Sequence, residues 1–363
     1  MSKAAELAKI GEVATNSQIG GRRNIIINGA MQVAQRGTSV AWASNGYLAL
    51  DRVATVNNST AGRFTMKQTA ITDLPGFANA LELDVTTADT SIAAGEVTTL
   101  QYKIEGQDLQ QLKKGTSSAE KVTLSFYVKA NAARVVVAEL MDGDNTRKIQ
   151  QKFTTTTGWT RHILTFAADT TGALDDDNAE SLQLQLWLHA GSTYTGGTFT
   201  SNTWAATTTA NRAAGIDSLY TSTDNNFFIT GVQLEVGSVA TPFEHRSYGE
   251  ELALCQRYFE VLGRGPNSYT MNFADMPIKI APVTNFAQGH AYKTMKRAAP
   301  TVVVYSRNNN SGKVSTMATG ADEGNNWAIN SGGVNGFHGV QRDGGTHSAG
   351  EGLEYGFEAD AEL

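Results

Sequence analysis

The stretch that decides the fold of this chain is Phe227-Phe228-Ile229-Thr230-Gly231-Val232-Gln233-Leu234-Glu235-Val236-Gly237. Successive side chains of a β-strand point to opposite faces, so the stretch has two sides. One side comprises Phe228, Thr230, Val232, Leu234 and Val236, and the other comprises Phe227, Ile229, Gly231, Gln233 and Glu235. We expect one of these sides to face a hydrophobic core. Pro242 has no N–H to donate to a sheet, so the sheet is predicted to end near Thr241.

A helix is predicted directly after this strand. Ser247 followed three residues later by Glu250 matches a capping box. Apolar residues then recur at helical spacing until Gly263, at Leu252, Leu254, Cys255, Tyr258, Phe259 and Leu262. The pattern predicts a connector helix over residues 247–263, between two β domains. Cys255 is the single cysteine of the chain, and we expect it to be a small buried hydrophobic residue.

Composition limits the class of protein. With 363 residues the chain is long enough for two domains and a short head. Charged residues make up 18%, the net charge is −6 and the pI is about 5.6. Because phosphate binding needs clustered Lys and Arg, this balance argues against a nucleic-acid partner. No apolar run is long enough to cross a bilayer and the N-terminus lacks the apolar core of a secretion signal, so we expect cytoplasmic synthesis and no membrane insertion.

The spacing of apolar and turn-forming residues along the chain predicts a mainly β protein with four parts. Residues 1–23 form an N-terminal helical attachment segment that needs something to dock on. Residues 24–246 contain at least eight short alternating strands, which favours two antiparallel layers in a jelly-roll β-sandwich. The connector helix over residues 247–263 follows, and residues 264–363 form a second, smaller β-sandwich. No solenoid repeat is present, which disfavours a parallel β-helix.

Two motifs carry a resemblance to a known family. The first is Asn24-Ile25-Ile26-Ile27-Asn28-Gly29-Ala30-Met31-Gln32-Val33-Ala34-Gln35-Arg36-Gly37-Thr38, joined to Asp51-Arg52. The second is Thr230-Gly231-Val232-Gln233-Leu234-Glu235-Val236-Gly237 with Ala240-Thr241-Pro242-Phe243-Glu244 and Cys255-Gln256-Arg257-Tyr258-Phe259. Together with the ending Ala359-Asp360-Ala361-Glu362-Leu363 they resemble bacteriophage and prophage tail-fibre or minor structural proteins.

This resemblance implies a jelly roll similar to carbohydrate-binding modules, followed by a smaller β domain, in a virion appendage that is commonly a homotrimer. It implies contact with other virion proteins through the N-terminal segment, and host-surface polysaccharide as a possible partner. Family members range from adhesins to purely structural appendages, so the resemblance names no receptor and no ligand residues. Synthesis in the host cytoplasm and release by lysis agree with the missing export signal. No cofactor is expected.

One strand offers the sharpest hypothesis for a ligand site. Between Ser181 and His189, leucines alternate with Gln183, Gln185, Trp187 and His189. An aromatic ring can cover the apolar face of a sugar while amides bond its hydroxyls, which is the combination that glycan sites use. Tyr127 extends the patch if its strand belongs to the same sheet. The alternative is that the polar excursion from Thr193 to Asp224, or a neighbouring subunit, covers this row and Trp187 serves packing.

Catalytic and metal chemistry are not favoured. The carboxylate clusters Asp142-Gly143-Asp144-Asn145 and Asp175-Asp176-Asp177 fit no EF-hand loop and are typical of solvated turns. A glycosidase needs two carboxylates across one cleft, and Glu82, Asp84, Glu139 and Glu235 are the residues that the tertiary structure would have to bring together. The sequence therefore predicts a non-enzymatic virion protein that binds host glycan. A polysaccharide depolymerase tailspike, or a structural head-fibre or adaptor protein without receptor contact, remain the alternatives.

Overall fold

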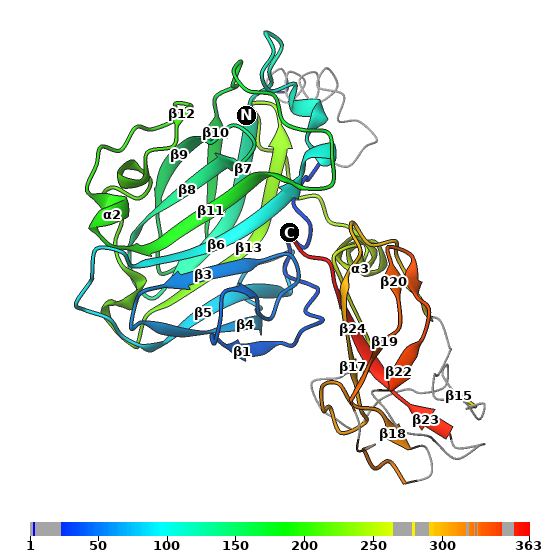
Figure 1. The fold of residues 1–363 in the computed structure, drawn as a ribbon. Helices are drawn as coiled ribbons and strands as arrows, with labels where there is room; N and C mark the ends of the chain where they lie inside the picture. The colour runs from blue at the N-terminus through cyan, green and yellow to red at the C-terminus, as the bar shows by residue number, and fades with distance from the viewer. Residues whose placement is uncertain are drawn as a thin grey trace. The chain divides into compact units, whose positions relative to one another are not determined.

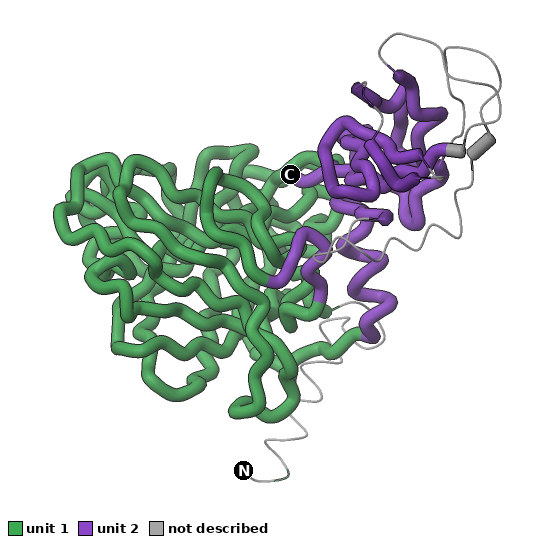
Figure 2. The backbone as a smooth tube through the Cα atoms, turned by 90° about the horizontal axis from the view of Figure 1, so that it is seen from below, with its two compact units in different colours: residues 1–32, 39–246 green, residues 33–38, 247–363 purple. Residues whose placement is uncertain are grey.

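The computed structural model describes Lys3 and residues 23–263, 278–279, 290–316, 319–322, 324, 326–342 and 352–363. The chain forms two compact units, coloured separately in Figure 2. The first comprises residues 1–32 and 39–246, and the second comprises residues 33–38 and 247–363. Residues 33–38, which the sequence assigns to the first β domain, therefore belong to the second unit. Apart from Lys3 and Arg23, the predicted attachment segment lies outside the described residues.

The first unit is a sandwich of two antiparallel sheets, shown as two layers in Figure 1. Over the described residues, the six-stranded sheet has the order β1 (Ser39–Ala41), β4 (Arg63–Ala70), β5 (Asn79–Thr87), β13 (Asn226–Val236), β7 (Val122–Ala130), β10 (Thr160–Phe166). The seven-stranded sheet has the order β12 (Ala205–Ala206), β9 (Arg147–Thr154), β8 (Val135–Asp142), β11 (Glu180–Ala190), β6 (Val97–Glu105), β3 (Ala54–Asn58), β2 (Gly46–Tyr47). The chain crosses between the sheets repeatedly. The predicted mainly β class, with an antiparallel jelly roll, is confirmed.

Short turns of helix fill several connections of the first unit. They are η1 (Gly106–Asp108), η2 (Gln110–Leu112), α2 (Ser192–Thr195), η3 (Thr209–Asn211) and η4 (Leu219–Thr221). In the part of the chain that the structure describes, no helix is long and apolar enough to cross a membrane.

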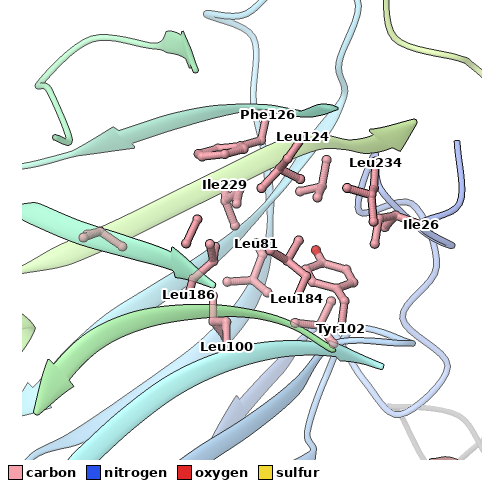
Figure 3. Packing of buried hydrophobic residues seen from close by; sticks show 14 of the residues in the cluster. Ile26, Leu81, Leu100, Tyr102, Leu124, Phe126, Leu184, Leu186, Ile229 and Leu234 are labelled. Carbon is pink, nitrogen blue, oxygen red and sulfur yellow. The ribbon is translucent and has the colours of Figure 1, made fainter. Parts of the chain in front are cut away.

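Leucine, valine and phenylalanine side chains from both sheets meet in one core. Figure 3 shows Leu184 and Leu186 of β11 and Leu100 and Tyr102 of β6 facing residues of the six-stranded sheet such as Ile229. All five side chains are at most 3% exposed. The alternation along β11 and β7 therefore sorts side chains as the sequence predicts, with one side of each strand in the core.

The deciding strand, β13, changes its inward side halfway along. Phe227 and Ile229 belong to the core, and so do Val232 and Leu234. Between them Gly231 has φ of +62°, and the pairing with β7 shifts between Thr230 and Gln233. This is a β-bulge with glycine in the left-handed conformation, which inserts one extra residue and reverses the phase of alternation. The predicted uninterrupted alternation is therefore wrong, and Phe228 and Thr230 lie on the outer side.

The bulge is also the attachment point for the chain's entry into the first unit. Val232 donates its N–H to the Gly29 carbonyl at 2.9 Å, and its own carbonyl accepts the Asn24 side-chain amide at 3.0 Å. A Cβ on Gly29 would lie 2.1 Å from the Val232 oxygen. Only glycine allows this approach of the two backbones.

A buried polar clasp closes the same end of the sandwich. Glu235 accepts the Thr241 N–H at 2.8 Å and the Thr241 hydroxyl at 2.7 Å. Glu244 accepts the N–H groups of Arg23 and Asn24 at 3.1 and 2.8 Å and pairs with Arg246 at 3.1 Å. The clasp joins the segment where the chain enters the unit to the segment where it leaves, and it satisfies polar groups that would otherwise be costly to bury.

The second unit begins with α3 (Tyr248–Gln256). The predicted capping box is present, because Ser247 Oγ accepts the Glu250 N–H at 3.3 Å and Glu250 Oε2 accepts the Ser247 N–H at 2.9 Å. Cys255 is buried as expected. The helix ends at Gln256 rather than Gly263, because Phe259–Leu262 forms the strand β14 and pairs with β24. Pairing along a sheet here prevails over helical spacing, so the predicted connector is half helix and half strand.

Small antiparallel sheets make up the rest of the second unit. Over its described residues they are β14–β24 (Gly356–Asp360)–β17 (Thr301–Tyr305), β15 (Ile278–Lys279)–β23 (Gly352–Glu354)–β18 (Ser315–Thr316), β16 (His290–Ala291)–β21 (Gly336–Phe337)–β20 (Gly332–Gly333) and β19 (Trp327–Ile329)–β22 (Val340–Arg342). Segment 33–38 contributes Gln35, which donates to the Phe259 carbonyl at 2.8 Å, and Arg36, whose guanidinium lies 3.6 Å from the Phe259 ring centroid and pairs with Asp360 at 3.1 Å.

Replacing Gly231 with Ala tests the bulge. Left-handed backbone is unfavourable for a residue with a Cβ by about 1–2 kcal/mol, and the added Cβ would lie 2.7 Å from Phe77 and 2.9 Å from Tyr127. We expect Gly231→Ala to lower the free energy of unfolding by at least this amount, measured by urea denaturation. The matched control is Gly95→Ala, because nothing lies within 4 Å of a Cβ at Gly95. Equal stability of the two variants would contradict the assigned role.

Because of the clasp, we expect the free energy of unfolding to fall at acidic pH. Burial alone would raise the pKa of Glu244, but the N–H groups of Asn24 and Arg23 and the Arg246 guanidinium outweigh it and hold the pKa below its ordinary value of 4.5. A carboxyl with a lowered pKa in the folded state stabilises the protein above pH 4.5, and the contribution is lost as the pH falls through the lowered pKa. We expect Glu244→Gln to be less stable at neutral pH and to lose less stability on acidification. Unfolding curves at several pH values measure this, and parallel pH profiles for the two proteins would disprove it.

Candidate functional site

The predicted ligand row lies on β11, in the seven-stranded sheet. Gln183, Gln185 and Trp187 alternate with core leucines and occupy the outer side of the strand. Gln183 is half-buried, Gln185 is 5% exposed and Trp187 is 1% exposed. His189, beyond a register shift in the pairing with β6, is fully buried. Three of the four side chains are therefore inaccessible to a large ligand in this conformation.

The cover over this row is the strap, residues 191–221, which leads away from β11 through α2 and β12 (Figure 1). Arg212 of the strap places its guanidinium 4.7 Å from the Trp187 ring. It also donates to both oxygens of the fully buried Glu139, the closest contact being 2.5 Å, and to Gln185 Oε1 at 3.3 Å. Gln150 donates to the Asn211 carbonyl at 2.9 Å. Arg212 and Asn211 of the strap thus bond three side chains of the sheet, Glu139, Gln185 and Gln150.

His189 connects the two ends of the strap to the sandwich. Its Nε2 lies 2.9 Å from Glu96 Oε2 and its Nδ1 lies 2.7 Å from Ser218 Oγ. Burial lowers the pKa of His189 below its ordinary value, although Glu96 and Asp89 act in the opposite direction. The Tyr220 ring packs against the imidazole with centroids 5.1 Å apart. This arrangement holds the strap in place.

The structure therefore matches the alternative in which the excursion covers the row and Trp187 serves packing. The condition for extending the row through Tyr127, that its strand shares a sheet with β11, is not met, because β7 belongs to the six-stranded sheet and β11 to the seven-stranded sheet. Tyr127 faces outward on the opposite side of the sandwich from Trp187. Whether any of these residues binds a ligand stays a prediction.

Around Tyr127, four half-buried rings and the buried ring of Phe77 collect on the outer side of the six-stranded sheet. We call this set the aromatic face, and it comprises Phe77, Tyr127, Trp159, Phe228 and Phe243. Polar and charged groups of the neighbouring strands stand beside the rings. Strand pairing places Lys67 opposite Glu82, Glu82 opposite Phe228, and Phe228 opposite Lys129.

The first group of rings on this face is built around Lys129. Its Nζ lies 5.1 Å from the Trp159 ring and 5.2 Å from the Phe228 ring, and these two rings meet edge to face at 6.3 Å. Asp73 accepts from Lys129 at 2.6 Å and from the Trp159 indole N–H at 2.9 Å. These contacts lower the pKa of Asp73 below its ordinary value. The indole is held in one orientation with its hydrogen-bonding group satisfied.

The second group surrounds Tyr127. Phe77 lies 5.3 Å from the Tyr127 ring and 5.1 Å from the Phe243 ring. Arg161, directly opposite Tyr127 on β10, donates to the Thr241 carbonyl at 2.5 Å. Gly231 is part of this group, since a Cβ there would strike both Phe77 and Tyr127. The bulge thus makes room for the rings as well as reversing the strand.

Sequence reasoning missed Trp159 and Phe228. Phe228 falls on the predicted core side if β13 alternates without interruption, and only the phase reversal at Gly231 turns it outward. Trp159 precedes the first residue of β10 and belongs to no alternating run. The one available signal was Gly231 itself, because an isolated glycine inside a strand pattern suggests a bulge.

The carboxylates weighed as a catalytic pair do not converge. Glu139 lies in the seven-stranded sheet and pairs with Arg212, whereas Glu82 and Asp84 lie on β5 of the other sheet and contact Lys67 at 4.0 and 2.6 Å. Glu235 is enclosed in the clasp. Within the described ranges, no group of three or more His, Cys, Asp or Glu side chains is arranged to hold a metal ion. Asp142 instead accepts from the buried Lys114 at 2.5 Å.

No family model matches this sequence, and no curated protein matches it. The chain is similar in structure to carbohydrate-binding modules with jelly-roll folds. A family 11 module from Clostridium thermocellum in complex with a mixed-linked tetrasaccharide has 14% identity and a TM-score of 0.27, with 56% of this chain and 99% of the module covered. A xylan-binding domain from Paenibacillus barcinonensis has 12% identity and a TM-score of 0.28, with 61% and 100% covered. The enzymatically active domain of a tailspike of bacteriophage CBA120 has 10% identity and a TM-score of 0.31, with 59% and 21% covered.

Removing Arg212 tests the strap. Arg212→Ala leaves Glu139 buried without its cation, which costs about 3–5 kcal/mol when a buried pair is broken on one side. We expect a loss of unfolding free energy of this order in urea denaturation. Lys113→Ala is the matched control, because its pair with Glu120 has side chains 53% and 36% exposed and is worth about 0–1 kcal/mol. If both variants lose the same stability, Arg212 does not anchor the strap.

Proposed function

We propose that this chain is a non-enzymatic, glycan-binding component of a bacteriophage virion, a tail fibre or related appendage. The observation that carries the proposal is the aromatic face, on which four half-buried rings, Tyr127, Trp159, Phe228 and Phe243, stand next to carboxylate, ammonium and guanidinium groups. A flat ring covers the apolar side of a pyranose, and polar neighbours bond its hydroxyl groups. The motifs around Asn24 and Gly231, which resemble phage appendage proteins, support the assignment to a virion.

A binding role is favoured over catalysis by the arrangement of the acidic groups. Bond cleavage in a glycan needs two carboxylates facing each other across one cleft. In the first unit, Glu139 and Glu235 are buried and bonded to internal partners, and Glu82 lies in a different sheet from Glu139. Under this proposal the protein binds host-surface polysaccharide without cleaving it.

The proposed mode of action is multivalent. Three copies in a homotrimer, attached to other virion proteins through the N-terminal segment, present three weak sites on one appendage. The second and third contacts then form at high effective concentration, so avidity exceeds the affinity of a single site. Made in the host cytoplasm, the protein leaves with the virion at lysis.

The mass of the purified protein in solution tests the trimer. About three times 38.7 kDa is expected, and a monomer would contradict this part of the proposal.

Replacing Trp159 with Ala tests the site. Loss of one stacking ring is expected to weaken single-site glycan binding by roughly tenfold, since an aromatic contact is worth about 1 kcal/mol or more with its buried area. The measurements are adsorption of purified protein to host cells and affinity for isolated surface polysaccharide. Phe228→Ala should act in the same direction. Ile92→Ala is the control, because this side chain is 45% exposed and lies in the connection between β5 and β6, not on a strand of the six-stranded sheet. Normal adsorption of Trp159→Ala with an unchanged melting temperature would refute the aromatic face as the site.

A further inference from the structure

We infer that the aromatic face selects an uncharged glycan and holds more than one of its sugar rings. The inference rests on the proposed function and adds the chemical class of the ligand. It follows from two features of the face, namely how its charges are paired and how its rings are spaced along β7.

Two ion pairs take up most of the charge beside the aromatic face. Lys129 and Asp73 form an ion pair at 2.6 Å, and Lys67 and Asp84 form another at 2.6 Å. Glu82 accepts the Thr69 hydroxyl at 2.6 Å and lies 4.0 Å from Lys67. Arg161, which bonds the Thr241 carbonyl, brings the charged groups named here to three cations and three anions. Such a surface has little net field to attract a charged ligand.

An acidic glycan would have to compete with Asp73 for Lys129. Asp73 holds two donors at once, Lys129 and the Trp159 indole, so displacing it would also release the ring. The Asp73 side chain is 52% exposed, which lets a ligand reach its free lone pairs without breaking the pair. A sugar hydroxyl both donates and accepts, so it can add to these groups while they stay paired. Neutral hydroxyl-rich ligands are therefore favoured over anionic ones.

The two ring groups are separated along the strand direction. Lys129, between Trp159 and Phe228, and Tyr127, beside Phe77, are two positions apart on β7, which is about 7 Å of strand. On β13, Phe228 faces Lys129 and Thr230 faces Tyr127, so the spacing is kept across both strands. One sugar ring on the first group leaves the second group free for its neighbour. The rings are fixed by their packing, which reduces the entropy lost when a ligand binds.

The test measures binding of the full-length protein to two sets of defined glycans. The neutral set contains glucan, mannan and galactan oligosaccharides of increasing length, and the acidic set contains polygalacturonate and polysialic acid fragments. We expect a neutral glycan to bind, to gain affinity from one sugar ring to several, and to change by less than about threefold between about 0.05 and 0.5 M salt, because no ion pair is formed. The variant Asp73→Asn frees Lys129, and we expect it to gain salt-sensitive binding of acidic fragments.

Three outcomes distinguish a failure of this inference from a failure of the proposed function. Acidic fragments that bind the wild-type protein more tightly than neutral ones, and weaken with salt, would overturn the inference and leave glycan binding intact. A single sugar that binds as well as a longer chain would overturn the extended site. Binding of every glycan unchanged by Trp159→Ala would instead contradict the proposed function. Ile92→Ala again serves as the control, and its binding should equal that of the wild-type protein.

Discussion

The first unit depends on the close approach of two backbones at Gly29 and Val232. The two residues come so near that a single Cβ on Gly29 would occupy the space of the Val232 oxygen. The approach is possible because Gly231 adopts a left-handed conformation and pushes Val232 out of the regular ladder. Asn24 then caps the carbonyl that the bulge exposes. The bulge at Gly231 therefore sets both the phase of β13 and the place where the entering chain is bonded.

The phase reversal decides which surface of the sandwich is available. Before the bulge, Phe228 is turned outward to join Trp159 and Lys129; after it, Val232 and Leu234 fill the core. On the other sheet, the outer groups of β11 and β8 are covered by the strap, with Arg212 filling the space between Trp187 and Glu139. The outer side of one sheet is thus covered by the strap, and the outer side of the other carries the rings and ion pairs of the aromatic face.

Much of the fold follows from local patterns. The alternating leucines of β11 and the alternating residues of β7 are core strands as predicted, and Ser247 with Glu250 forms the predicted capping box. The candidate site was less accessible to such reasoning. Trp187 and His189 carry the residue types that a glycan site uses, yet their burial depends on Arg212 and Ser218, which lie 25 and 29 residues further along the chain. Periodicity gives the side of a strand on which a residue lies and contains no information about what covers that side.

From the sequence alone came the mainly β class, the break after Arg246 and the alternation that fills the core, because these rest on interactions between residues close in the chain. Tertiary structure alone decided three matters: that β14 continues as a strand where a helix was expected, that Tyr127 and Trp187 lie on opposite sheets, and that Phe228 faces outward. The physical reason is that strand partners come from distant parts of the chain. Leu262 pairs with Phe357 and Thr230 with Tyr127, and the register of such pairs is set by the whole fold.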